Sequence, residues 1–484
     1  MNTGTQTRTT TLGFYSLIAI MLLGFALRFV YIGVPSLWLD EAISLEVERL
    51  DWHNFFRVIS EREINMSVYY FLLHFWICFG HSEFALRSLS ALFGAITIPA
   101  IYALGTTLFC EATGIVAALL IAVNPAHISY SQSARGYALT IFLTVISSWL
   151  FVRAIENDSP AIWTAYSLVN MCGLYSHVFF AWVVLVQLLS IVCVRDFSWR
   201  LARWSYAALV LSMLPLAYVE YLSQGTHLSW LQRPSLVDLF NSFINLGGCS
   251  GMLLTGFLLF FAVLALLARK QARDERFPTA IEFLTLWWIL PIVLTFAISF
   301  RHPLFVPRYL SISLPPLLLL SGRGIVRSRN KFLNFATISA VLLVSAPAIG
   351  DYYDDAKRND QNNNWRDTAL YMRGVLREGD ALLFYYGAER FPFDFYRPPH
   401  QPDQKFAIYP PLSSAQLLLG DGKEPDDELL HVLASRYRRV YVLSEYRPNP
   451  LYHRVIEGVS MSRCVRQAEA RNFGFVRVDE FDYC

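Results

Sequence analysis

The stretch Pro35-Ser36-Leu37-Trp38-Leu39-Asp40-Glu41 places two adjacent acids directly after an apolar run over residues 12–32. That run is long enough to cross a membrane, so both carboxylates lie close to where the chain leaves the hydrocarbon. Carboxylates are costly there and need a reason to be present. Two interpretations are open. Asp40 can cap a helix over residues 42–50 with Glu41 in its first turn, or a carboxylate can act as a base at the membrane surface.

The composition sets the broad class of the protein. Of 484 residues, 55% are hydrophobic and only 16% are charged, whereas a soluble protein of this length needs more surface charge. Apolar blocks of about twenty residues fill positions 12–349, and residues 350–484 resemble a soluble domain in composition. We therefore expect an α-helical polytopic membrane domain at 1–349 and a soluble domain at 350–484. The net charge of +2 says nothing about nucleic acid, and no basic run suggests it, so nucleic acid is not expected as a partner.

The apolar blocks predict about eleven membrane spans. The first block lacks a small-residue cleavage site, which indicates a retained signal anchor. The amphipathic stretches 42–50 and 52–59 are typical of interfacial helices, and the apolar run Val68–Phe79 is too short to cross comfortably. The expected spans are 12–32, 84–109, 115–126, 137–154, 161–176, 178–195, 204–222, 249–268, 281–299, 309–322 and 332–349.

Positive charge orients these spans. Counting spans puts three loops rich in Arg and Lys on one side, which the positive-inside rule makes cytoplasmic; these loops cover residues 195–203, 269–276 and 323–331. The N-terminus is then cytoplasmic, and the soluble domain lies outside the inner (plasma) membrane. The acidic loop is also outside, provided that Val68–Phe79 does not cross.

The outer loops hold arginines at helix ends, where positive charge is unexpected. A lone arginine of this kind often anchors a helix at the interface. Arg135, Arg301 and Arg308 together with two acids instead form a pattern for binding an anion, such as a lipid phosphate of the outer leaflet. Tyr137, Tyr309 and His177 are hydrogen-bond donors to that anion; alternatively, the two tyrosines are interfacial aromatics and His177 is a packing histidine.

The sequence of residues 350–484, which we call the tail, predicts a small α/β domain. Helical patterns at 365–376 and 426–437 alternate with strand patterns at 381–386 and 438–444. The tail has no glycine-rich phosphate loop, no nucleophile elbow and no Cys/His cluster, so an independent active site is not expected there. The seven cysteines show no metal-ligand spacing, although Cys464 and Cys484 could pair in an oxidising compartment.

Five motifs follow one another along the chain: Leu37-Trp38-Leu39-Asp40-Glu41-Ala42, Ser82-Glu83-Phe84-Ala85-Leu86-Arg87, Ser131-Gln132-Ser133-Ala134-Arg135-Gly136-Tyr137, Phe305-Val306-Pro307-Arg308-Tyr309-Leu310 and Asn364-Trp365-Arg366-Asp367. Together they resemble the motifs of bacterial GT-C class glycosyltransferases, in particular glycosyltransferase family 39. The layout is also similar to that of protein O-mannosyltransferases and of the lipid A aminoarabinose transferase.

The resemblance implies a transferase that uses a polyprenyl-phosphate-linked sugar at the outer face of the membrane. Asp40 would be the base in a single inverting displacement, and Glu41 would orient Asp40, bind the acceptor or position a metal. Donor phosphate and sugar would be bound by residues at the outer helix ends: Arg135, Arg308, Tyr137, Tyr309, Gln132, His177, Arg87 and Asn65. For Arg87, pairing with Glu83 is an equal alternative.

One departure from the family pattern affects a wall of this site. The family commonly has an Asn-Pro-Pro-type turn, but this chain reads Glu61-Arg62-Glu63-Ile64-Asn65-Met66-Ser67-Val68-Tyr69-Tyr70. The prolines are absent and Asn65 remains as a residue that could hydrogen-bond sugar.

Several questions stay open at the level of the sequence. A transporter or flippase of lipid-linked saccharides is the main alternative, although such proteins place polar groups near the bilayer midplane. The sugar is a mannose-like hexose or a related one, and the acceptor is a lipid, a glycan or a protein. No cofactor is expected with certainty, since an acid pair could hold a divalent metal but no further ligand is identifiable.

Overall fold

The computed structural model describes residues 10–194, 197–223, 233–248, 252–267, 280–327, 330–362, 364–397, 406–420, 425–445, 450–461 and 465–483. Cys464 and Cys484 lie outside these ranges. The chain forms two compact units. The first contains Met1–Ile32, Ile64–Leu72 and Arg87–Tyr353, and the second contains Gly33–Glu63, Leu73–Leu86 and Asp354–Cys484.

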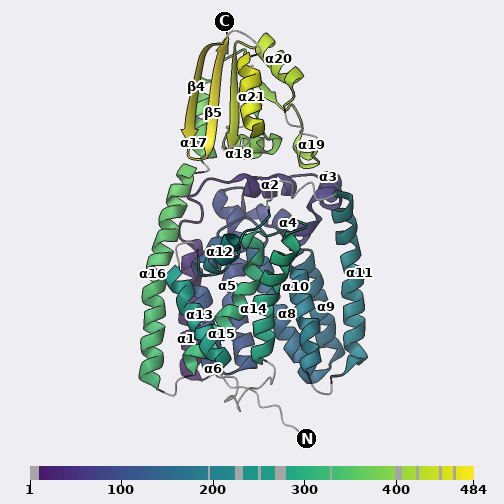
Figure 1. Ribbon diagram of the computed structural model, residues 1–484, viewed down its shortest axis with the longest axis vertical. Helices are drawn as coiled ribbons and strands as arrows, with labels where there is room; N and C mark the ends of the chain where they lie inside the picture. Colours follow the sequence, from purple (N-terminus) through teal and green to yellow (C-terminus); the bar gives the residue numbers. More distant parts are fainter. Residues whose placement is uncertain are drawn as a thin grey trace. The chain divides into compact units, whose positions relative to one another are not determined.

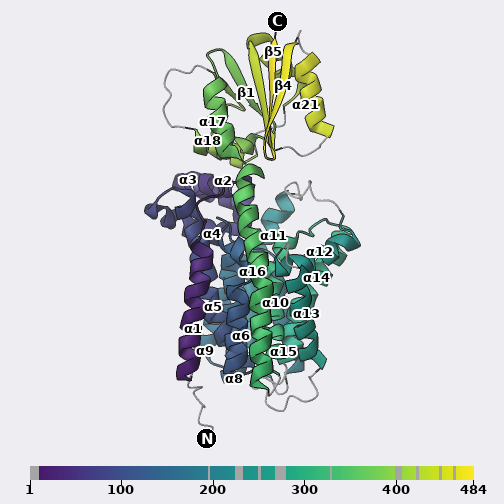
Figure 2. The ribbon, with the colours of Figure 1, turned by 90° about the vertical axis from the view of Figure 1, so that its left-hand side faces the viewer.

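The first unit is helical, and its long helices run side by side (Figures 1 and 2). Helices α4, α5 and α16 each have residues in both units. The elements are α1 (Thr11–Phe29), η2 (Ile64–Met66), α4 (Ser67–Trp76), α5 (Glu83–Leu108), α6 (Glu111–Ala122), α7 (Pro125–Ser131), α8 (Tyr137–Asn157), α9 (Pro160–Leu174), α10 (Phe180–Ser190), η4 (Ile191–Cys193), α11 (Trp199–Ser223), α12 (Leu236–Gly247), α13 (Met252–Leu267), α14 (Ala280–Ser299), η7 (Pro307–Ser313), α15 (Leu314–Val326) and α16 (Lys331–Asn362).

A helix lies at each of the eleven predicted span positions. Within the described residues, six helices are long and apolar enough to cross a membrane, or up to eight if the bent pairs α6–α7 and α12–α13 each count as one span. The protein is therefore a multi-pass membrane protein, and the count of eleven stays a prediction. The helix α4 has only 10 residues, which agrees with the expectation that Val68–Phe79 is too short to cross.

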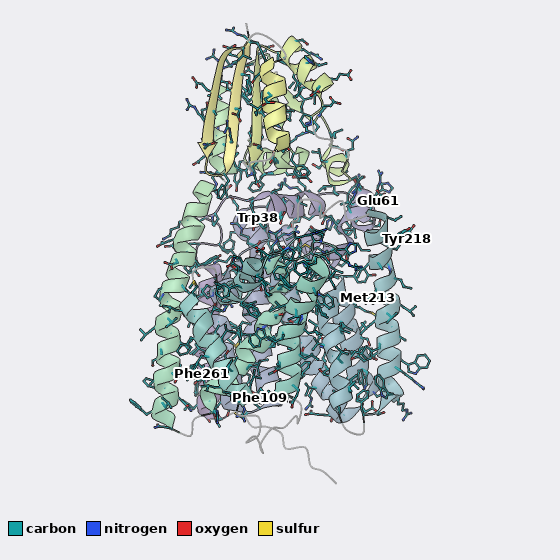
Figure 3. All side chains as sticks on the ribbon, in the orientation of Figure 1. Trp38, Glu61, Phe109, Met213, Tyr218 and Phe261 are labelled. Atoms are coloured by element: carbon teal, nitrogen blue, oxygen red, sulfur yellow. The ribbon has the colours of Figure 1, made fainter. Side chains whose placement is uncertain are left out.

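Burial separates central from peripheral helices. The span Pro307–Val326 is 83% buried, whereas Thr11–Phe29 and Phe332–Asp354 are each 17% buried. The exposed apolar side chains of these last two spans suit contact with lipid, and Tyr218 likewise projects outward from α11 (Figure 3).

A buried polar network joins α8, α9 and α10: Tyr166 donates to Gln187 (2.8 Å), Gln187 to Ser147 (2.9 Å), and Ser147 to Asn170 (2.9 Å). In a membrane such interhelical bonds contribute about 0.6 kcal/mol each.

The second unit contains a five-stranded mixed sheet of order β2-β1-β3-β5-β4. The strand β1 is parallel to β2 and β3, and β5 is antiparallel to β3 and β4. Figure 2 shows α17 and α21 on opposite faces of the sheet. The elements are α2 (Leu39–Glu48), α3 (Trp52–Val58), η1 (Ile59–Glu63), η3 (Ile77–Phe79), α17 (Trp365–Val375), β1 (Asp380–Phe384), η8 (Gly387–Glu389), α18 (Arg390–Tyr396), β2 (Ala407–Tyr409), α19 (Ser414–Leu418), α20 (Asp427–Arg436), β3 (Arg439–Glu445), α21 (Pro450–Met461), β4 (Val465–Phe473) and β5 (Val476–Tyr483).

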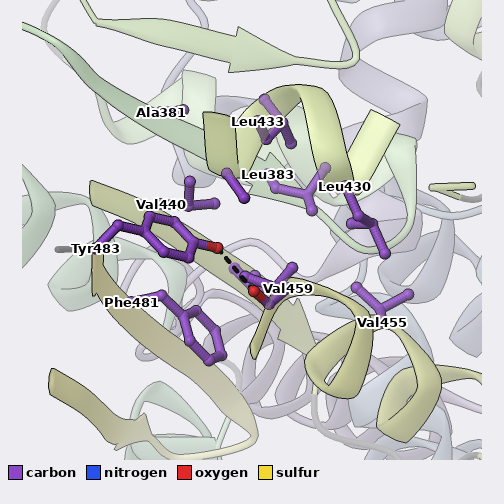
Figure 4. Packing of buried hydrophobic residues seen from close by; sticks show 11 residues of the cluster. Ala381, Leu383, Leu430, Leu433, Val440, Val455, Val459, Phe481 and Tyr483 are labelled. Atoms are coloured by element: carbon purple, nitrogen blue, oxygen red, sulfur yellow. Dashed lines mark hydrogen bonds between the residues drawn. The ribbon is translucent and has the colours of Figure 1, made fainter. Parts of the chain in front are cut away.

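Two apolar clusters bury the two faces of this sheet. Leu430 and Leu433 of α20 and Val455 and Val459 of α21 pack on one face (Figure 4). On that face the Tyr483 hydroxyl donates to the Val459 carbonyl oxygen at 2.9 Å. Trp365 and Met372 of α17 pack on the other face. Because strands buried on both faces read as continuous apolar runs, β1 and β3 were predictable from the sequence, and the α/β class of the tail is confirmed.

Candidate functional site

The acid pair lies in the first turn of α2, in the second unit. The helix begins at Leu39 and its N-cap is Trp38, which has an extended backbone and makes no side-chain capping bond. Asp40 is therefore not the N-cap, although Glu41 does lie in the first turn as expected. Both carboxylates stand at the positive end of the helix dipole. Glu41 is 1% exposed, and Asp40 is half-buried.

Residues of the tail surround this helix. Ala42 packs with Ala388, Phe391 and Leu417 in one apolar cluster. Partial burial, and then the charges of Glu63, Glu389 and Asp40, raise the pKa of the Tyr386 phenol. The tail thus contributes the apolar support of α2 and a phenol that interacts electrostatically with Asp40.

Five of the predicted donor-binding residues gather in the first unit around His177, in the turn between α9 and α10. The His177 ring is 4.8 Å from the Tyr309 ring and 6.0 Å from the Tyr137 ring, between centroids. The Arg308 guanidinium lies over the Tyr309 ring at 5.6 Å. We call Arg135, Tyr137, His177, Arg308 and Tyr309 the His177 cluster.

The pKa of His177 reflects its burial and the positive charge of the neighbouring arginines. Burial, and then the positive charges of Arg135 and Arg308, lower the pKa of His177 to about 3. The imidazole is therefore neutral at physiological pH. Its Nδ1 accepts the Phe179 backbone N–H at 3.2 Å, which assigns the remaining proton to Nε2. The turn thus holds a neutral N–H donor in a positive potential, a combination that suits an anion.

Arg135 is held between α7 and α8 by two contacts. Its Nη1 donates to the Tyr70 hydroxyl at 3.0 Å, and its carbonyl oxygen accepts the Ser90 hydroxyl at 3.1 Å. Tyr70 is fully buried. Sequence reasoning did not assign Tyr70 to the site; the signal was its position in the Tyr69-Tyr70 pair that follows the altered turn.

Asn65 positions the turn that carries His177. Its Oδ1 accepts the Val178 backbone N–H at 2.6 Å, and the Val68 N–H donates to the Tyr175 carbonyl at 3.1 Å. The expected residue is thus next to the cluster, where its side-chain oxygen binds backbone. This bond gives the 175–178 turn a defined position without the prolines of the family pattern.

Gln132 and Arg87 bind backbone carbonyls. Gln132 Nε2 donates to the carbonyls of Leu27, Arg28 and Val30, at 3.2, 3.1 and 2.7 Å. These carbonyls belong to the end of α1, where the last turn lacks intrahelical partners. Arg87 is 2% exposed and its Nη1 donates to the Ile32 carbonyl at 2.9 Å. Both residues therefore hold the segment that leaves α1.

Metal ligands do not gather anywhere in the described ranges: no group of three or more His, Cys, Asp or Glu side chains there is placed to hold a metal ion. A metal held by the acid pair would need further ligands from an acceptor, from water or from other parts of the chain.

Part of the chain matches a known protein family. Residues 66–221 match the family described as dolichyl-phosphate-mannose-protein mannosyltransferase. The matched segment contains Arg135, Tyr137 and His177. The match agrees with the resemblance to glycosyltransferase family 39. No curated protein matches the chain.

Solved structures match nearly the whole chain. The crystal structure of ArnT from Cupriavidus metallidurans in the apo state superposes with a TM-score of 0.64 at 12% identity, covering 97% of this chain and 98% of that one. Its complex with undecaprenyl phosphate gives 0.63 at 13% identity, with 98% of each chain covered. The apo oligosaccharyltransferase of Archaeoglobus fulgidus gives 0.53 at 13% identity, covering 90% of this chain and 69% of that one. The chain therefore has the GT-C fold, as expected.

Proposed function

We propose that this protein is an integral-membrane glycosyltransferase that moves a sugar from a polyprenyl-phosphate donor to an acceptor at the outer face of the inner membrane. The observation that carries this assignment is the convergence of Arg135 and Arg308 on a buried, neutral His177. A lipid phosphate is the ligand that such a group suits in a membrane protein. The fold it shares with ArnT, which has been crystallised with undecaprenyl phosphate, supports the same ligand.

Asp40 is the base in the proposed reaction. The acceptor oxygen attacks the anomeric carbon as its proton passes to Asp40, and the bond from that carbon to the phosphate oxygen breaks. The polyprenyl phosphate leaves with the electron pair, and the configuration at the anomeric carbon inverts. Accepting the proton contributes about 10²–10⁴-fold to the rate. Glu41 orients Asp40, binds the acceptor or positions a divalent metal.

The His177 cluster acts on the leaving group. Negative charge grows on the departing phosphate, so fixed donors there stabilise the transition state more than the ground state. Arg135 and Arg308 supply charge, and Tyr137, Tyr309 and His177 supply neutral hydrogen bonds. Asn65, Gln132 and Arg87 hold the turn and the chain after α1 in place, and their binding of the sugar donor stays a prediction.

The topology follows from the charge distribution of the loops. The N-terminus is cytoplasmic, and residues 350–484 form a periplasmic or extracytoplasmic domain. The sugar is a mannose-like hexose or a related one, and the acceptor is a lipid, a glycan or a protein.

The test is transfer by purified protein in liposomes. The protein is offered a panel of polyprenyl-phosphate sugars with envelope extract as the acceptor, and the release of polyprenyl phosphate is measured by mass spectrometry. Release that depends on both substrates supports a transferase. Movement of a fluorescent lipid-linked saccharide across the bilayer without release would instead identify a flippase. Mass spectrometry of envelope glycans, glycolipids and proteins from a deletion strain then identifies the missing sugar and its acceptor.

A further inference from the structure

Two tail residues contact the chain that enters α2. The Tyr396 hydroxyl, at the end of α18, accepts the Leu37 backbone N–H at 2.8 Å and donates to Glu83 Oε1 at 2.9 Å. Burial and then the charge of Glu83 raise the pKa of Tyr396 to about 12. The hydroxyl therefore stays protonated over the range in which an enzyme works, and it keeps both bonds.

Arg366 adds a second connection to the same segment. Its Nη2 pairs with Glu83 Oε1 at 2.7 Å, and its Nη1 donates to the Val34 carbonyl at 3.1 Å. Its guanidinium also lies over the Tyr396 ring, 5.3 Å from the centroid. Arg366 and Tyr396 thus share the Glu83 carboxylate, and together they bind the backbone on both sides of Pro35.

The motif Asn364-Trp365-Arg366-Asp367 explains why Arg366 is held firmly. The Asn364 side chain caps α17 by accepting the Asp367 N–H at 2.9 Å. Trp365 is fully buried, and its indole N–H donates to Glu445 of β3 at 3.0 Å. Arg366, which follows Trp365 directly, is therefore attached to the sheet through a capped helix and a buried indole.

Further contacts hold the body of α2. Ala42 packs with Ala388, Phe391 and Leu417, and the Ser414 hydroxyl of α19 donates to Glu46 Oε2 at 2.6 Å. The helix is thus supported by the tail along its length as well as at its entry. Since Asp40 lies three residues beyond Leu37 in the first turn of α2, the orientation of its carboxylate depends on these contacts.

We infer that the soluble domain is part of the catalytic apparatus, with Tyr396 and Arg366 as positioning residues that fix the approach of the acid pair to the substrate. This inference rests on the proposed function, because it takes Asp40 as the base. Misplacement of a reacting group by about 1 Å can cost 10²-fold in rate. Loosening the entry to α2 therefore lowers kcat, and binding of the donor at the His177 cluster is retained.

The variants that test this are Tyr396→Phe, which removes only the hydroxyl, and Arg366→Ala, with Arg366→Lys as the conservative partner. Matched controls in α17 are Tyr371→Phe and Arg373→Ala; Arg373 is exposed. We expect kcat to fall roughly 10- to 100-fold in Tyr396→Phe and Arg366→Ala, with donor KM within about twofold of wild type, partial rescue in Arg366→Lys and no change in the controls. A kcat within twofold of wild type in both test variants would overturn the inference.

Hydrogen–deuterium exchange separates failure of this inference from failure of the proposed function. In Tyr396→Phe the peptide covering residues 33–39 should exchange faster, and the peptides of β1 and β3 should be unchanged. This measurement needs no substrate, so it holds even if no sugar donor is turned over. Unchanged exchange at 33–39 would refute the contact, whatever the activity.

Discussion

Glu48, at the last position of α2, is a buried carboxylic acid whose replacement should stabilise the protein increasingly as the pH rises from about 4.5 to about 8. Its side chain is fully buried, and within the described part of the chain neither carboxylate oxygen makes a hydrogen bond. The His81 Nδ1 lies 3.9 Å from Glu48 Oε1. Burial, partly offset by Arg49, raises the pKa of Glu48 from 4.5 to about 8. A helix C-terminus also disfavours a negative charge.

The sign of the effect follows from where the proton is held. Below about pH 4.5 both the folded and the unfolded chain keep the proton, and Glu48 adds no pH dependence. Above it the unfolded chain releases the proton while the folded chain retains it, so stability falls as pH rises until about pH 8. Each pH unit in this interval costs about 1.4 kcal/mol, and raising the pH from 5 to 7 costs about 2.7 kcal/mol.

The substitution Glu48→Gln keeps the shape and removes the titration. We expect the difference in unfolding free energy, variant minus wild type, to rise by about 1–3 kcal/mol between pH 5 and pH 7. The assay is thermal unfolding in detergent at both pH values. The control is Glu61→Gln, since Glu61 is an exposed partner of Arg57 and should change by less than about 0.5 kcal/mol. A difference for Glu48→Gln that is independent of pH would refute the reasoning.

Three further substitutions test the site. Asn65→Ala removes the acceptor of the Val178 N–H, and we expect a rise in the KM for the sugar donor of about 5- to 50-fold. The control is Asn157→Ala, because Asn157 is exposed at the end of α8; an unchanged KM in Asn65→Ala would count against the role of the 175–178 turn. Arg308→Ala should raise the inhibition constant of free polyprenyl phosphate at least about tenfold. The control is Arg203→Ala, which removes a guanidinium stacked on Trp204 and should leave that constant unchanged. Equal inhibition constants in Arg308→Ala and wild type would exclude Arg308 from the phosphate site. Gln132→Leu removes the side-chain N–H group that bonds the Leu27, Arg28 and Val30 carbonyls, of which Leu27 also accepts the Tyr353 hydroxyl, and it should lower the unfolding free energy by about 1–3 kcal/mol. A variant that is stable but no longer binds the sugar donor would instead show that Gln132 contacts that substrate.

Helices and strands followed from hydropathy because burial in lipid or in a sheet leaves long apolar runs. The run at Val68–Phe79 shows how length refines that reasoning, since its helix α4 has 10 residues. The β4–β5 hairpin was not foreseen. Its strands, Val465–Phe473 and Val476–Tyr483, are rich in charged residues that alternate with apolar ones, a weaker signal than the continuous apolar runs of β1 and β3.

The sequence identified polar residues of the site by their type, but it did not identify the groups to which they hydrogen-bond. Binding of the donor by Asn65, Gln132 and Arg87 stays a prediction, but their backbone partners were not foreseen, because a side chain that can hydrogen-bond a sugar can equally bind a backbone carbonyl or N–H. The helix start at Leu39 illustrates the same limit, because Asp40 has capping chemistry and yet lies one residue inside the helix. Which group such a side chain meets is decided by tertiary packing.

Contacts distant in sequence were the least accessible. Leu37 and Tyr396 are 359 residues apart, and no local pattern links them. The sequence did single out Ser82–Arg87 and Asn364–Asp367 as motifs, and the structure joins Glu83 of one to Arg366 of the other. The sequence thus identified the two motifs separately, and only the fold revealed that they contact each other through Glu83 and Arg366.

The central claim is that Asp40 is the base, and transfer by purified Asp40→Asn in liposomes tests it most directly. The matched control is Asp51→Asn, which caps α3 in the same segment and keeps a good capping residue. We predict that Asp40→Asn lowers kcat by at least about 10²-fold, with donor binding and thermal unfolding within error of wild type, while Asp51→Asn stays active. Sugar transfer by Asp40→Asn at a rate near that of wild type would contradict the account.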